Sequence, residues 1–199
     1  MERILYGDNQ FFAVNHISDA KSMEQSIKFK DNAAIMATLD QAIEAGINTF
    51  MCTTHDRIAF VCDTIRANPD KYANAVTDLG ISGTIKQYVP GNIFGTMFKG
   101  GAALVSQNYI SIMELLIDAE MKMFKGINTP VIFLQNVITD LLLGLGMVDI
   151  LKGFHDYIAK KYNAEAGFIT MNMPKLLETL ENIGIENPEI ETDDSFYTF

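Results

Sequence analysis

The feature that most constrains the fold is the segment Gly46–Arg57, where an apolar run lies between two segments of helical periodicity. Apolar residues recur at helical spacing over residues 35–43, and Gly46 can end that helix by taking a left-handed conformation. Ile47–Cys52 is predicted to be a buried strand, and Asp56 behind it can cap a second helix. This helix, strand, helix order predicts a parallel α/β sheet.

The rest of the chain repeats the alternation. Asp31 can cap the helix before the central strand. Residues 13–31 are predicted to form a loop or partial helix, which is either a solvated connection or a segment that folds over the mouth of a site. Further strands are expected at Ile4–Tyr6, Ile81–Val89, Val131–Leu134, Gly167–Asn172 and Ile185–Ile190, with helices over 110–123, 147–158 and 174–183. We expect one domain over residues 1–190 and an acidic tail over 191–199.

Such a pattern favours a barrel of the TIM type, made of repeated parallel β/α units. A complete barrel needs eight strands and typically ~250 residues, whereas this chain has 199 residues and five or six predicted strands. The predicted fold is therefore an incomplete or shortened barrel, and the alternative is an open sheet. A barrel that lacks strands has two unpaired edges, so we expect self-association or coverage of the gap by the Gly91–Gly101 loop or the tail.

Charge and composition exclude several classes of protein. A formal net charge of −10 opposes nucleic-acid binding, which depends on clustered lysine and arginine. No signal peptide is visible, and the longest apolar run is far shorter than the ~20 residues that span a bilayer. The two cysteines, Cys52 and Cys62, suit reduced thiols. We therefore expect a cytoplasmic protein that binds neither nucleic acid nor membrane.

Candidate site residues lie where predicted strands end, because catalysis in parallel α/β folds sits at the carboxyl ends of the strands. The candidate catalytic residues are His55, Lys86 and Cys52. The candidate substrate-binding residues are Asp8, Gln10, Asp56, Arg57, Gln135, Asn136 and Asn172.

Each catalytic candidate has a structural alternative. His55 suits acid–base chemistry near neutral pH, or it lies in a loop without a chemical role. Cys52 becomes a nucleophile if Arg57 or Lys86 lowers the pKa of its thiol, and it is otherwise a core residue. Lys86 can polarise a carbonyl or form a Schiff base, or it is a solvated lysine at a strand end. No metal site is predicted, because Asp8, His16, Cys52 and His55 match no ligand spacing.

Three segments carry a resemblance to a known superfamily. Leu39–Phe50 is similar to the helix of aldo-keto reductases that ends in Ala-Gly-Ile-Asn and leads into the second barrel strand. Thr84–Lys86 resembles the strand that carries the family's lysine, and Gly167–Pro188 resembles its sixth strand and the following helix. The resemblance implies a TIM barrel, oxidoreductase chemistry and NADP as cofactor.

The same resemblance implies a catalytic tetrad of Asp, Tyr, Lys and His, which this chain keeps only in part. Lys86 matches the family's lysine. Cys52 stands at the position of the aspartate and Arg57 at that of the tyrosine, while Gln135 and Asn136 replace the histidine.

Two functions are therefore compatible with the sequence. The first is a barrel enzyme, or a remnant of one, that acts on a small polar carbonyl-containing metabolite as an oxidoreductase or lyase. The alternative is a non-catalytic module that binds a small molecule or another protein.

Overall fold

The computed structural model describes residues 5–15, 18–69, 71–72, 80–85 and 108–192. Its strands form one six-stranded sheet in which every neighbouring pair is parallel. The strands are β1 (Tyr6–Gly7), β2 (Thr49–Thr53), β3 (Gly80–Ile85), β4 (Val131–Leu134), β5 (Glu165–Thr170) and β6 (Glu189–Thr192). The helices are η1 (Asn9–Phe12), α1 (Asp19–Lys28), α2 (Asn32–Glu44), α3 (Asp56–Ala67), α6 (Asn108–Met121), α7 (Asn136–Leu145), α8 (Val148–Tyr162) and α9 (Met173–Asn182).

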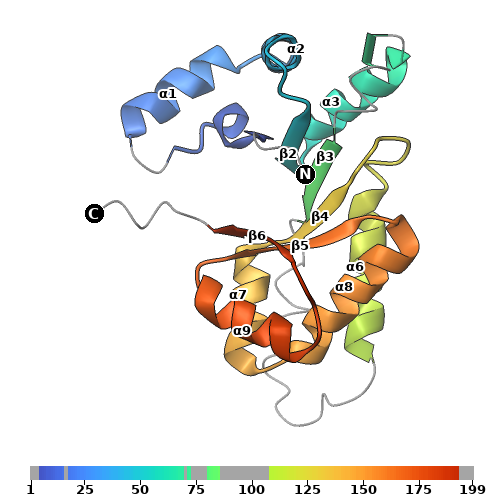
Figure 1. Cartoon of the computed structure of the whole chain (residues 1–199). Coiled ribbons are helices and arrows are strands. Elements are labelled where there is room, and N and C mark those ends of the chain that lie inside the picture. Colours follow the sequence, from blue (N-terminus) through green and yellow to red (C-terminus); the bar gives the residue numbers. More distant parts are fainter. Residues whose placement is uncertain (1–4, 16–17, 70, 73–79, 86–107, 193–199) are drawn as a thin grey trace.

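The order of the strands in the sheet follows their order in the chain, from β1 to β6. The predicted α/β class with parallel strands is confirmed. Among the described residues, however, the sheet is open, because β1 and β6 are its two ends and do not pair with each other. Figure 1 shows α6 to α9 gathered on one side of β4, β5 and β6, while α2 and α3 lie beside β2 and α1 lies farther from it, against η1.

The core lies between the sheet and its helices. Alternate residues of the strands pack there, including Cys52 of β2, Ile132 of β4 and Phe168 of β5, each at most 1% exposed. Fully burying such a side chain stabilises the fold by roughly 1.5–3 kcal/mol. On the other face of β4, Val131 and Phe133 are also buried. A strand buried on both faces reads as the continuous apolar run that β4 has.

Several helix boundaries follow the predicted signals. The Oδ1 atom of Asp31 accepts a hydrogen bond from the Ala33 amide at 3.0 Å and so begins α2. Gly46 ends the same helix region with a φ of +82°, a conformation that favours glycine. Pro174 lies in the first turn of α9, and Gly184 follows that helix with a φ of +77°.

Other elements differ from the prediction. Residues 19–28 form the regular helix α1, whose N-terminus is capped by Ser18 Oγ accepting from the Lys21 amide at 3.3 Å. The helix α7 directly after β4 was not predicted. β6 continues to Thr192, two residues past the predicted domain end. Lys86, the Gly91–Gly101 loop and residues 193–199 lie outside the described residues.

Candidate functional site

The carboxyl ends of β1 and β2 are joined through Asp8. This carboxylate is only 6% exposed, and its Oδ2 atom accepts hydrogen bonds from the Thr53 amide at 2.7 Å and the Thr53 hydroxyl at 3.0 Å. Asp8 follows β1 directly and Thr53 is the last residue of β2. The predicted binding residue Asp8 therefore holds together two strand ends at the edge where the site is expected.

His55 lies two residues beyond β2 and is the N-cap of α3, in place of the predicted Asp56. Its Nδ1 atom accepts a hydrogen bond from the Arg57 amide at 3.1 Å. In the neutral ring this arrangement places the proton on Nε2, which is then a donor. The ring also packs against Phe12, with centroids 4.4 Å apart. Asp56 lies in the first turn of α3, where the helix dipole stabilises a negatively charged carboxylate.

Arg57 has a structural role in this region. Its Nε atom donates to Asn32 Oδ1 at 3.0 Å, and its two terminal nitrogens donate to the backbone oxygens of Phe11 and Phe29. These contacts join α3 to η1, to the end of α1 and to the start of α2. A guanidinium presents its donors in a planar fork, which suits several acceptors at once.

Cys52 is buried in the core with 1% of its surface exposed. Burial raises the pKa of its thiol well above the ordinary value, and the charge of Asp8 and the nearby Cys62 raise it further. This environment stabilises the thiol over the thiolate, whereas a nucleophilic cysteine needs the thiolate. The contacts of Cys52 are those of a core residue.

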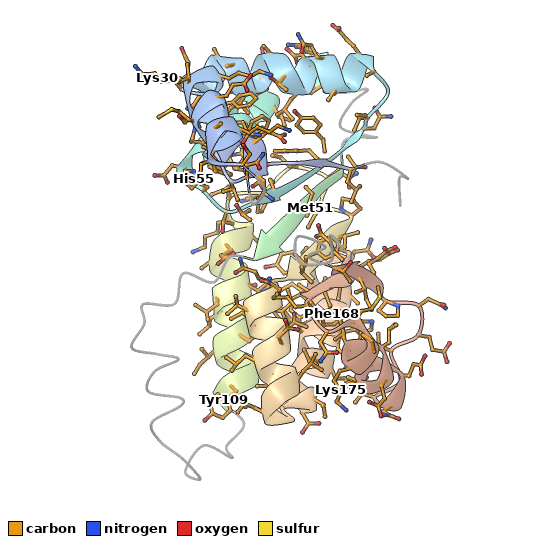
Figure 2. The ribbon with its side chains drawn as sticks, turned by 90° about the vertical axis from the view of Figure 1, so that its left-hand side faces the viewer. Lys30, Met51, His55, Tyr109, Phe168 and Lys175 are labelled. Carbon is orange, nitrogen blue, oxygen red and sulfur yellow. The ribbon has the colours of Figure 1, made fainter. Side chains whose placement is uncertain are left out.

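A pocket of about 500 Å³ opens beside His55. Its polar lining is Thr54, His55, Asp56 and Glu120, and its apolar lining is Leu116, Ala119 and Met123. The Thr54 hydroxyl donates to Glu120 Oε2 at 3.1 Å and so joins the loop after β2 to α6. In Figure 2, α6 rises from Tyr109 toward the level of His55. We call this the His55 pocket.

The other predicted binding residues do not line the His55 pocket. Gln10 Nε2 donates to the Gly7 carbonyl at 2.7 Å, which stabilises the turn after β1. Gln135 is the N-cap residue of α7 but forms no side-chain cap, and Asn136 Oδ1 accepts from the Val137 amide at 2.8 Å. Asn172 caps α9 by accepting from the Lys175 amide at 3.3 Å. Lys86 lies outside the described residues.

The pocket residues that sequence reasoning missed come from α6 and from the turn that follows it. Leu116, Ala119, Glu120 and Met123 are separated by more than sixty positions from Thr54, and Glu120 is 66 positions from it. Their spacing is that of an ordinary helix face, and no local signal indicates a site. Thr54 itself lies in the segment that the sequence singles out, so its position after a buried strand is the one usable signal.

A second polar cluster at a strand end also escaped the sequence analysis. Asp140 of α7 accepts hydrogen bonds from the Thr170 hydroxyl and, at 3.0 Å, from the Met171 amide. The Thr170 hydroxyl in turn accepts from the Asn172 amide at 2.9 Å. This cluster orders the turn between β5 and α9, which places Asn172 at the helix start.

Comparison with protein-family models, curated proteins and solved structures found no match to this chain. No helix in the described part of the chain is long and apolar enough to cross a membrane. In the same part, no group of three or more His, Cys, Asp or Glu side chains is arranged to hold a metal ion.

Proposed function

We propose that this protein is a small-molecule-binding α/β protein of barrel lineage. Support for the lineage comes from the strand order, since six parallel strands in chain order are what six consecutive units of a (β/α)₈ barrel would have. The predicted resemblance to aldo-keto reductases agrees with this lineage at Leu39–Phe50 and Gly167–Pro188. Binding sites in such folds lie at the carboxyl ends of the strands.

The proposed ligand site is the His55 pocket, and the observation that carries the proposal is its mixed lining at the carboxyl end of β2. Pockets that bind small ligands combine apolar walls with a few fixed polar groups. Nε2 of His55 can donate to a carbonyl or hydroxyl oxygen of the ligand. The carboxylates of Asp56 and Glu120 suit hydroxyl or amine donors and disfavour an anionic ligand. The ligand class is thus a small polar carbonyl compound without net negative charge.

Binding without catalysis is the better supported of the two functions. Arg57 is bonded to the backbone of Phe11 and Phe29, and Cys52 is a buried thiol, so neither replaces the missing tetrad groups. The second candidate is carbonyl chemistry of the aldo-keto reductase type with NADP. One observation favours it: Nδ1 of His55 accepts from the Arg57 amide, so in the neutral ring the proton lies on Nε2, which can donate a hydrogen bond to a substrate carbonyl.

A ligand screen tests the proposal. The melting temperature would be measured with a panel of small hydroxy-carbonyl and amino-carbonyl compounds, each beside its carboxylate analogue, with and without NADPH. A ligand that binds the folded state raises the apparent stability. We expect a neutral or cationic compound to raise the melting temperature and its carboxylate analogue to have less effect. If no compound of the panel shifts the transition, the proposed binding function is wrong.

His55→Asn makes the screen specific for the pocket. Asparagine is a good N-cap residue, so the variant retains the cap of α3 but loses the imidazole. We expect it to fold normally and to lose most of the ligand shift. His155→Asn is the matched control, because His155 lies on α8 outside the pocket. NADPH consumption by the wild type but not by His55→Asn would favour the enzymatic candidate.

A further inference from the structure

A second pocket, of about 620 Å³, lies on another side of α6. It is bounded by the end of α6, by the turn before β4 and by the end of α8. Asp118 lines it from α6, Lys122, Lys125 and Thr129 line it from the segment between α6 and β4, and Lys161 and Tyr162 line it from α8. It shares no lining residue with the His55 pocket. We call it the lysine pocket.

The lysine pocket differs in charge from the chain as a whole. Its lining includes Lys122, Lys125 and Lys161 against a single carboxylate, Asp118, in a protein of net charge −10. Asp118 is engaged, since its Oδ2 atom accepts from Lys161 Nζ at 2.5 Å. Its Oδ1 atom accepts from the hydroxyls of Tyr157 at 2.7 Å and Tyr162 at 2.6 Å. Asp118 therefore neutralises Lys161 and leaves two positive charges in the lining.

No ion pair or helix cap explains why Lys122 and Lys125 stand together at this place in the described part of the chain. Within the part of the chain that the structure describes, neither forms an ion pair. Lysines after a helix often stabilise its last carbonyl groups. Here the carbonyls of Met123 and Lys125 already accept from Arg66 at 2.9 and 3.2 Å. Those of Glu120, Met121 and Lys122 accept from backbone amides of the following turn.

We infer that the lysine pocket binds a small anion of the phosphate class, held by Lys122 and Lys125. An ammonium group binds phosphate as a compact point charge. Lys122 and Lys125 are both exposed and begin and end one turn, which the Lys125 amide closes by donating to the Lys122 carbonyl at 3.4 Å, so their two charges suit a dianion. Phe124 and Ile127, which are 3% and 8% exposed, give the pocket an apolar wall for the organic part of a phosphorylated metabolite. This site is independent of the His55 pocket, whose carboxylates disfavour the same ligand.

Inorganic phosphate is the probe for this inference. Its affinity would be measured by calorimetric titration of the full chain, against chloride at matched ionic strength. We expect saturable phosphate binding to the wild type. The affinity of Lys122→Gln/Lys125→Gln for phosphate should be lower by about tenfold or more, because the loss of charge-assisted hydrogen bonds weakens binding by at least that factor. Lys122→Arg/Lys125→Arg retains the charges and should retain most of the affinity.

Two control variants separate the possible causes. Lys30→Gln/Lys160→Gln changes the net charge equally at exposed lysines outside the lining, and it should bind phosphate like the wild type. His55→Asn should also bind phosphate normally, even if the proposed function at the His55 pocket fails. The inference is overturned if phosphate binds no better than chloride, or if the Lys30/Lys160 control loses as much affinity as the Lys122/Lys125 variant.

Discussion

The ring of Phe133 in β4 occupies the space that a side chain at Gly167 in β5 would need. The two residues are direct neighbours in the parallel register of these strands. A Cβ atom at Gly167 would lie 2.5 Å from Cε1 and 3.0 Å from Cγ of Phe133. Phe133 is 2% exposed, so its ring has little room to move. Glycine at position 167 thus leaves room for a large aromatic ring against the neighbouring strand.

We therefore expect Gly167→Ala to lower the free energy of unfolding by about 2 kcal/mol, the usual cost of overpacking a filled core. Gly144→Ala is the matched control, because nothing lies within 4 Å of a Cβ atom there and the residue is inside α7. That change should stabilise the protein by about 0.5–1 kcal/mol. Chemical denaturation measures both. Equal effects of the two substitutions would contradict the contact with Phe133.

Asp118 makes stability depend on acid pH. Desolvation acts to raise the pKa of its carboxyl, but hydrogen bonds from Lys161, Tyr162 and Tyr157 outweigh it and lower the pKa to about 2. A group whose pKa is lower in the folded state stabilises the protein above its unfolded pKa, here 3.8. This contribution is present at neutral pH and is lost as the pH falls from about 4 toward 2.

Asp118→Asn should therefore lower the free energy of unfolding by about 1 kcal/mol at neutral pH. A larger effect is not expected, because ion pairs that are partly exposed to solvent contribute little to stability. The difference from the wild type should shrink as denaturation is repeated from about pH 4 toward pH 2. Glu181→Gln is a suitable control, since Glu181 is exposed and forms no ion pair with the described residues. A difference that is constant over this pH range would show that the charge of Asp118 is not responsible.

Arg57→Lys should lower the free energy of unfolding by about 2 kcal/mol, because an ammonium cannot reach Asn32 Oδ1 and the carbonyls of Phe11 and Phe29 together. Arg66→Lys is the comparison, as Arg66 is an exposed arginine that also donates to two carbonyls. We expect a loss below about 1 kcal/mol there. Thermal or urea unfolding followed by circular dichroism ranks the two. If Arg57 served only to bind a substrate, Arg57→Lys would destabilise the protein less than Arg66→Lys does.

Cys52→Ser should lower the free energy of unfolding by about 1 kcal/mol or more, because a buried hydroxyl without a partner carries a desolvation cost that a thiol largely avoids. The Cys52 thiol should also react with a thiol reagent only as fast as the protein opens, since the side chain is 1% exposed and the reagent cannot reach it in the folded state. Rapid modification of Cys52 in the native protein would restore the nucleophile hypothesis.

Local signals in the sequence were sufficient for the class of the fold and for many boundaries. Asp31 and Gly46 act on backbone groups within a few residues of themselves, so their effect can be read without tertiary information. The apolar run of β4 likewise predicts a strand buried on both faces. The same local reading misassigned the cap of α3, because serine, threonine, asparagine and aspartate are the usual cap residues and His55 is not one of them.

Only the tertiary structure decided which polar groups share a site. Asp8 and Thr53 are 45 positions apart, and Thr54 and Glu120 are 66 apart, yet each pair is joined by hydrogen bonds. Contacts of this range depend on how helices and strands pack, and the helical spacing of α6 is the same whether its residues face a core or a pocket. The sequence by itself determined the parallel α/β class and the strand ends where polar residues gather. Packing alone determined that Arg57 holds the backbone, that Cys52 is sealed in the core and that His55 borders a pocket.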